Sequence, residues 1–185
     1  MKKIFGLMII GMGIMQFSMA QDSDGKGGFD KSKLFFGGGL GLAFGTYTIV
    51  NVSPLAGYRF SELFAAGVGI NYSYYGYNDG YWNYKQSYLG MSIFGRVYPV
   101  RQFFIQVQPQ ENYMWYTQSG IGSYQDQPTL KLNQFVPSLL IGGGAAIPTG
   151  GNGAITISVM YDVLQNYYSP YYRQAVYGFG YTMGF

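Results

Sequence analysis

The chain has 185 residues, with eleven lysines and arginines against eight aspartates and glutamates, a formal net charge of +3. Without Lys2 and Lys3 the balance is nine basic to eight acidic side chains, which excludes the basic surface of a nucleic-acid-binding protein. Charged residues make up 10% of the sequence, against ~25% in typical soluble domains, and aromatic residues make up 19%. Cysteine and histidine are absent, which excludes disulfides, ordinary zinc sites and His-dependent nucleophiles.

The first twenty residues have the pattern of a secretory signal peptide. Two lysines precede an apolar run, residues 4–17. The small residues Ser18 and Ala20 then occupy the two positions that a signal peptidase reads, and we expect cleavage before Gln21. As a helix the run would span only about 21 Å, less than a bilayer core of about 30 Å. Residues 21–32 are polar and Gly-rich, and we expect a flexible periplasmic N-terminus there, followed by one domain over residues 33–185.

From Lys33 onward, large apolar residues alternate with small or polar ones. The period of two places the two sets on opposite faces of β-strands. Eight such runs are found, near residues 34–45, 50–59, 64–74, 89–98, 103–110, 134–144, 154–163 and 177–185. Each has about the length that a tilted strand needs to cross a bilayer.

These runs predict an all-β fold, an eight-stranded antiparallel up-and-down transmembrane β-barrel. No segment after residue 20 offers ~18 consecutive apolar residues for a membrane helix. In hydrocarbon every backbone N–H and C=O needs a partner within the protein, so a sheet must close on itself. We expect the large residues of each run to face lipid and the small ones to face a filled interior.

The connectors alternate in length, and both termini fall on the side of the short ones. The short connectors are 60–62, 99–102 and 147–152, and the long ones are 76–86, 117–131 and 165–172. This layout predicts periplasmic turns and extracellular loops.

Aromatic residues gather beside the long connectors. They include Tyr74, Tyr77, Tyr81, Trp82, Tyr113, Trp115, Tyr167 and Tyr171. We interpret them as a girdle at the membrane–water boundary together with loop packing. A tyrosine-rich recognition surface in the loops is the alternative.

Four charged residues of the strands are candidates for an interior polar network or for ion pairs. Arg59, Arg96 and Asp162 fall on the inward face by alternation. Glu111 falls on the outward face, but Pro109 often marks a bulge, and we expect a bulge that turns Glu111 inward. A narrow polar lumen that passes a small solute is the functional alternative.

Two segments resemble a known family. The run SPLAGYRFSELFAAGVGINYSYY is similar to the hairpin between the second and third strands in the small porin-like outer-membrane β-barrel family of Gram-negative bacteria. The closing GFGYTMGF resembles that family's last strand, and the resemblance covers about residues 33–185. It implies passage through the periplasm, and insertion by the barrel-assembly machinery, which would read Tyr181, Met183 and Phe185. It assigns no functional residue, because members of this family share a fold and not an activity.

The predicted function is that of a non-enzymatic integral protein of the cell outer membrane, with a structural or surface-interaction role through its Tyr-rich loops. The expected partners are outer-membrane lipid and an unidentified surface ligand, without cofactor or metal. The first alternative is a narrow porin-like channel for small or apolar solutes. Two others are a lipid-acting enzyme that uses Asp162, Glu111 and loop tyrosines, and a soluble lipocalin-type barrel with its apolar face inward.

Overall fold

A computed structural model describes residues 30–43 and 47–184. The predicted signal peptide, residues 21–29 and Phe185 lie outside this range. The strands are β1 (Leu34–Ala43), β2 (Tyr47–Arg59), β3 (Phe64–Asn78), β4 (Trp82–Val100), β5 (Phe103–Gly120), β6 (Leu130–Gly150), β7 (Gly153–Asp162) and β8 (Ala175–Met183). Two short 3-10 helices, η1 (Lys31–Lys33) and η2 (Gly122–Tyr124), complete the described elements. None of the helices described there is long and apolar enough to span a membrane.

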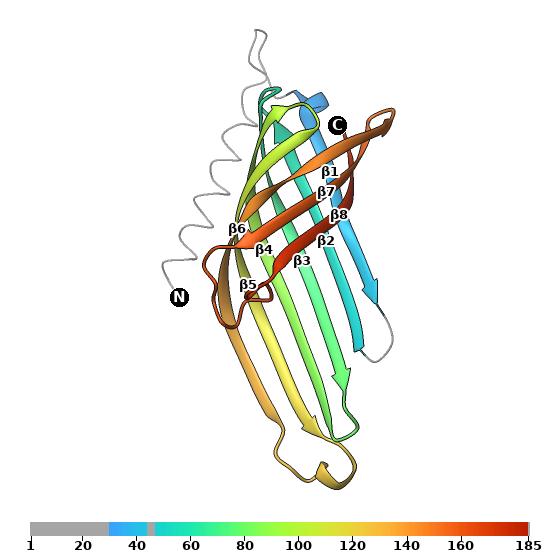
Figure 1. The fold of residues 1–185 in the computed structure, drawn as a ribbon, viewed down its shortest axis with the longest axis vertical. Coiled ribbons are helices and arrows are strands. Elements are labelled where there is room, and N and C mark those ends of the chain that lie inside the picture. The colour runs from blue at the N-terminus through green and yellow to red at the C-terminus, as the bar shows by residue number, and fades with distance from the viewer. Residues whose placement is uncertain (1–29, 44–46, 185) are drawn as a thin grey trace. The chain divides into compact units, whose positions relative to one another are not determined.

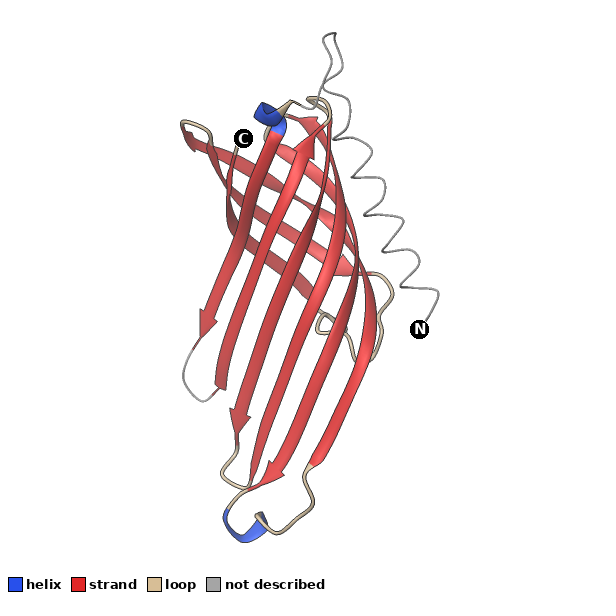
Figure 2. Ribbon diagram, turned by 180° about the vertical axis from the view of Figure 1, so that it is seen from behind, coloured by secondary structure: helices blue, strands red, loops and turns tan. Residues whose placement is uncertain are grey.

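The eight strands form a closed antiparallel barrel in sequence order (Figures 1 and 2). Each strand pairs with the one before it, and β8 pairs with β1 to close the sheet. The predicted fold class is therefore confirmed. The fold also fits the outer-membrane β-barrel family that the hairpin and the closing strand resemble.

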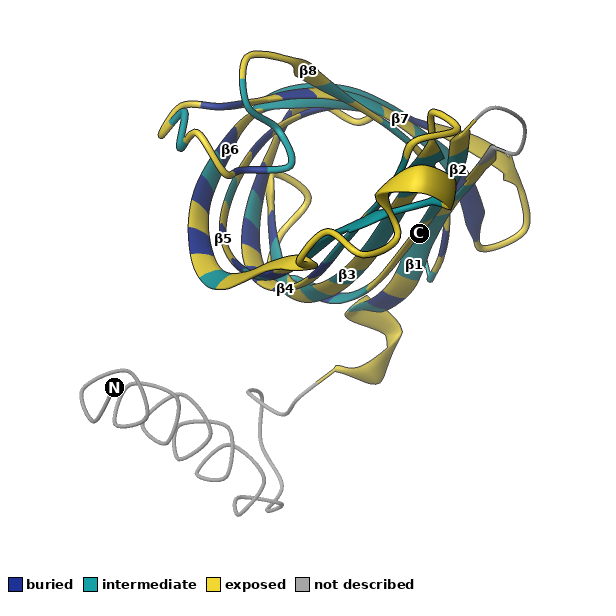
Figure 3. Cartoon of the chain, turned by 90° about the horizontal axis from the view of Figure 1, so that it is seen from below, coloured by how far each residue is buried: buried dark blue, intermediate teal, exposed yellow. Residues whose placement is uncertain are grey.

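The two faces of the barrel differ in the way that the alternation predicts. On the outside, Leu40, Phe135 and Phe179 are 65–67% exposed, whereas inward-facing Phe94 and Val136 are buried. Figure 3 shows buried and exposed residues alternating along β5 and β6. Because the large apolar residues face outward, the soluble lipocalin-type alternative is wrong.

Four strands are much longer than the ten residues that the runs suggest: β3, β4, β5 and β6 have 15, 19, 18 and 21 residues. The predicted long loop 76–86 is wrong, since β3 and β4 continue until only residues 79–81 connect them. The loop predicted at 117–131 shortens to 121–129. Tyrosine, which suits strands and pairs well across them, extends the sheet where polar residues had indicated a loop.

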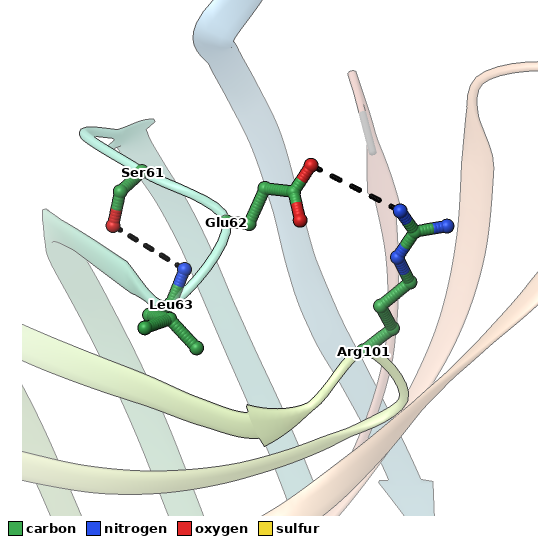
Figure 4. A network of polar contacts seen from close by, with 4 residues as sticks. All are labelled: Ser61, Glu62, Leu63 and Arg101. Atoms are coloured by element: carbon green, nitrogen blue, oxygen red, sulfur yellow. Dashed lines mark hydrogen bonds and ion pairs between the residues drawn. The ribbon is translucent and has the colours of Figure 1, made fainter.

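The turns on the other side are short, as expected, and we call their side the short-turn end. In the first of them, the Ser61 hydroxyl accepts hydrogen bonds from the backbone N–H groups of Leu63 and Phe64, at 3.3 and 3.1 Å. Glu62 lies 3.9 Å from Arg101 of the β4–β5 turn (Figure 4). Both side chains are more than 80% exposed, so this ion pair adds little stability.

Aromatic side chains fill the lumen, the space that the strands enclose, toward the short-turn end. Phe35, Phe94, Tyr98 and Phe104 form a buried cluster together with Ala65. Glycines make room for them: a Cβ on Gly67 would lie 2.6 Å from Phe94 Cζ, and one on Gly144 would lie 2.7 Å from Phe104 Cζ. The inward-facing glycines are therefore needed for packing.

Replacing such a glycine should destabilise the barrel. Gly67→Val would push a side chain into Phe94 and the β2 backbone, and we expect a loss of about 1–3 kcal/mol in unfolding free energy. Gly95→Val is the matched control, because a Cβ there meets only Phe64 Cε2, at 3.9 Å. Urea unfolding of the two variants, followed by heat-modified gel mobility, measures the difference. Equal midpoints would contradict this packing role.

Candidate functional site

A row of amide side chains crosses the lumen along the inner face of β5. Gln106, Gln108, Gln110 and Asn112 lie two residues apart, so their side chains share one face. Each Nε2 donates to the next side-chain oxygen, at 2.6, 3.1 and 2.5 Å in turn. At the head of the row, Arg96 Nε donates to Gln106 Oε1 at 2.6 Å.

The row continues from β5 to the end of β7. Asn112 Nδ2 donates to Ser138 Oγ at 3.4 Å, and Ser138 Oγ lies 3.0 Å from Ser169 Oγ. The Ser169 hydroxyl donates to Asp162 Oδ2 at 2.7 Å, so its own oxygen accepts from Ser138. The hydrogen bonds thus run in one direction from the buried cation Arg96 to the buried carboxylate Asp162, and we call this chain the polar ladder.

The polar ladder explains how two opposite charges are held inside the barrel without touching. Asp162 and Asn112 are fully buried, and Arg96 is 6% exposed. Asp162 Oδ1 also accepts the backbone N–H groups of Leu139 and Leu164, at 3.0 and 3.1 Å. Buried charges require such partners, and the predicted interior network is present for these two residues.

The other two charged candidates differ from each other. Arg59 lies inside the barrel as expected, with its guanidinium 5.4 Å from the centre of the Tyr98 ring. Glu111 lies exposed on the outer face, and the predicted bulge is wrong, since Pro109 pairs with Leu139 in unbroken register. A proline interrupts ladder hydrogen bonds without adding a residue, and only an added residue would have shifted the face.

The position of Glu111 along the barrel lowers the free-energy cost of pointing its carboxylate outward. It pairs with Pro137, whereas the pairing of β6 with β7 ends at Leu140, so the carboxylate lies at the limit of the closed part of the barrel. Asp162 points inward, so the two carboxylates do not share a site. The catalytic pair considered for a lipid-acting enzyme is therefore not formed.

The interior is only partly filled, which corrects the expectation of a packed lumen. A cavity of about 520 Å³ is lined by the amide row on one side and by β1, β2 and β8 on the other. Phe94, Arg96 and Phe104 bound it toward the short-turn end.

The loop between β7 and β8, residues 163–174, covers the other side of the cavity. Tyr171 reaches into the lumen, where its hydroxyl accepts from Gln110 Nε2 at 3.0 Å. Tyr88 donates to the Tyr168 carbonyl at 3.3 Å, and Asp162 and Ser169 hold the base of the loop. Tyr171 is therefore a loop aromatic that closes the lumen and takes no part in a girdle.

Other predicted aromatics lie outside, as a girdle requires. Tyr113 packs edge-on against Trp115 and Phe135, with ring centroids 4.7 and 4.8 Å apart, on the outer face of β5 and β6. Tyr74 has the outward parity of β3 and is half-buried. Tyr167 is 73% exposed in the 163–174 loop.

A second set of aromatics lies on the inner face where the sheet extends beyond the closed part. Figure 1 shows β4, β5 and β6 continuing past the ends of β7 and β8. Four tyrosines line a hollow of about 280 Å³ there, together with Asp79 and Gln86. We call these four the tyrosine face: Tyr75, Tyr77, Tyr84 and Tyr116.

Contacts between strands hold the tyrosine face. The rings of Tyr77 and Tyr84 stack at 6.0 Å with a 24° angle between their planes, and Tyr47 stacks on Tyr75 at 6.3 Å. Tyr77, expected in the girdle or in loop packing, has the lumen-side parity of β3 and therefore does not lie on the outer face. Trp82 shares that inner parity on β4 and packs against Tyr124, and Tyr81 is an exposed neighbour in the turn.

Asp79 orders the turn beside the tyrosine face. Its Oδ1 accepts the backbone N–H groups of Tyr81 and Trp82, at 2.9 and 2.6 Å. These hydrogen bonds, the one from Trp82 most of all, lower the pKa of Asp79 below its usual value. The turn therefore keeps a negative charge at neutral pH.

Comparison with known proteins finds similarity in structure but not in sequence. No family model matches the chain, and no curated protein matches it. Among solved structures it is similar to the crystal structure of Ail, the attachment invasion locus protein of Yersinia pestis, with 11% sequence identity and a TM-score of 0.49. The similarity covers 81% of this chain and 93% of that chain.

Sequence reasoning missed several members of these sites. Asn112, Ser138 and Ser169 complete the polar ladder, yet small polar residues in strands and loops give no signal of their own. Tyr84 and Tyr116 could have been found, because extending the two-residue alternation past Tyr88 places Tyr84 on the inner face. Tyr181 and Met183 of the proposed assembly signal lie on the outer face, 45% and 61% exposed.

Asp162 should control the order of the 163–174 loop. Asp162→Ala removes the acceptor for Ser169 and for two backbone N–H groups, and we expect a loss of about 1–3 kcal/mol in stability. Amide hydrogen exchange should rise across residues 163–174 and stay unchanged in the β4–β5 turn. Asp126→Ala, in the exposed 121–129 loop, is the control. Unchanged exchange in the 163–174 loop would refute the role assigned to Asp162.

Proposed function

We propose that this chain is an integral β-barrel protein of a bacterial outer membrane, which acts without catalysis by binding a partner at the cell surface. The observation that carries the membrane placement is the outward apolar face of a closed sheet. Water would not tolerate so many exposed large side chains, whereas hydrocarbon requires them. The Tyr113–Trp115–Phe135 group supplies the aromatic girdle near one boundary.

The interaction role rests on the tyrosine face. Rigid rings with polar tips give a large contact area at little entropic cost, as in antibody paratopes. Stacking between neighbouring strands fixes the rings before a partner binds, and Gln86 and the charged Asp79 provide hydrogen-bonding groups at the rim. The face lies on a part of the sheet that extends beyond the closed barrel, where it is open to a large partner.

Single cysteines test the placement and the orientation, since the natural sequence contains none. Ser123→Cys lies in the 121–129 loop beside the tyrosine face, and Glu62→Cys lies in the β2–β3 turn at the short-turn end. On intact cells a membrane-impermeant maleimide should label Ser123→Cys but not Glu62→Cys. After permeabilisation of the outer membrane both should be labelled.

The opposite pattern on intact cells would place the tyrosine face in the periplasm and overturn the proposed surface role. A protein found in the soluble periplasmic fraction would overturn the membrane placement itself. The natural sequence, which has no thiol, measures background labelling in both conditions.

A further inference from the structure

The seam between β1 and β8 is much shorter than the other strand pairings. Among the described residues three pairs join the two strands, Phe36–Met183, Gly37–Thr182 and Gly38–Tyr181. In contrast, β1 pairs with β2 over ten residues, from Leu34 to Ala43. From Gly39 to the end of β1, the described residues of β1 and β8 form no ladder with each other. Figure 1 shows the two strands close together near their paired residues and diverging from there.

The lumen cavity extends into this unpaired part of the seam. It is lined by consecutive residues of both strands, 38–41 of β1 and 174–180 at β8. Leu40 and Gly41 pair with Val52 and Asn51 of β2 but form no ladder with described residues of β8, so this wall of the cavity is the free edge of a strand. The cavity therefore opens sideways between β1 and β8, toward the apolar outer surface.

Arg96 gives the cavity a positive charge. Its guanidinium lies between two rings, 4.8 Å from the Phe94 centroid and 4.6 Å from that of Phe104. Within the described part of the chain no carboxylate forms an ion pair with it; the one ion pair found there joins Arg101 and Glu62. The cavity thus combines a buried cation and a row of amides on its wall with a lateral opening beside apolar side chains.

We propose that the lumen binds a single-chain amphiphile with a carboxylate head, which enters sideways between β1 and β8. The head group would lie against Arg96 and the glutamines, and the acyl chain would extend toward the seam, where Leu40 and Phe179 line the opening. The volume of about 520 Å³ suits one small molecule. Pro170 and Tyr171 of the 163–174 loop line the cavity on the side away from the short-turn end, and the proposed route of entry is the lateral one.

Gly41 offers a way to block this site without disturbing the fold. It lies on the unpaired part of β1 and lines the cavity, and a Cβ there would meet only Asn51, at an ordinary 3.6 Å. Gly41→Leu should therefore fill the opening, whereas Gly95→Leu places the same side chain on the outer face as a matched control. Heat-modified gel mobility verifies that each variant is folded.

The experiment uses the folded mature chain in phosphatidylcholine nanodiscs, with radiolabelled palmitate and the uncharged hexadecanol as probes. The radioactivity bound to discs that hold the barrel, after subtraction of the radioactivity bound to empty discs, should saturate near one palmitate per barrel. Because hydrogen bonds to a charged head group are stronger than those to a neutral hydroxyl, palmitate should bind roughly tenfold or more tightly than hexadecanol. Gly41→Leu should lose this binding, and Gly95→Leu should retain it.

No saturable palmitate binding to the folded barrel would overturn the inference, as would equal binding by Gly41→Leu and Gly95→Leu. Equal affinity for hexadecanol would refute the role of Arg96 in holding a carboxylate. The inference rests on the proposed membrane placement, which the cysteine labelling tests separately. Failure to bind palmitate in a correctly oriented, folded barrel therefore affects this site alone.

Discussion

The constraint on which the structure depends is that every strand presents one face to an apolar surrounding while its backbone finds partners only within the sheet. Closure into a barrel meets the second requirement, and the two-residue alternation meets the first. Large side chains can then occupy the outer face, where Leu40 and Phe179 are exposed. The inner face is left to glycine, polar residues and a few well-packed rings.

That division decides what the interior can hold. Glycines at Gly67 and Gly144 let Phe94 and Phe104 fill one end, and the polar ladder connects the two buried charges across the remainder. Because every donor in the ladder points toward Asp162, the aligned amides and hydroxyls satisfy the buried carboxylate and hold the two charges apart. The same ladder forms one wall of the cavity and holds the 163–174 loop over it.

The sequence was sufficient to predict the barrel, since alternation over eight runs leaves little freedom in which face each residue takes. It also predicted the inward positions of Arg96 and Asp162. It was insufficient for Glu111, because a proline alone does not reveal whether a strand contains an extra residue. The reach of β4 and β5 past the closed part was missed because polar, tyrosine-rich segments suit both loops and extended strands.

The ladder could not be predicted for a different reason. Its members come from β4, β5, β6, β7 and the 163–174 loop, and the relative heights of these elements depend on strand tilt and register, which local patterns leave open. The two-residue alternation predicts which face of the sheet a residue lies on, but it does not predict which side chain that residue contacts across the lumen. The tyrosine face has the same origin, since it requires the inner parities of β3, β4 and β5 to coincide beyond the barrel.

The most direct test of the account compares two neighbouring positions on β7 in a lipid bilayer. Spin labels at Ile157→Cys and Ser158→Cys should differ in their collision rates with oxygen, which dissolves in acyl chains, and with a water-soluble nickel chelate. Ile157, which is 46% exposed, should collide mainly with oxygen, and Ser158, which lines the cavity, should be shielded from it. High nickel accessibility at position 157, or greater oxygen accessibility at position 158, would contradict the outward apolar face.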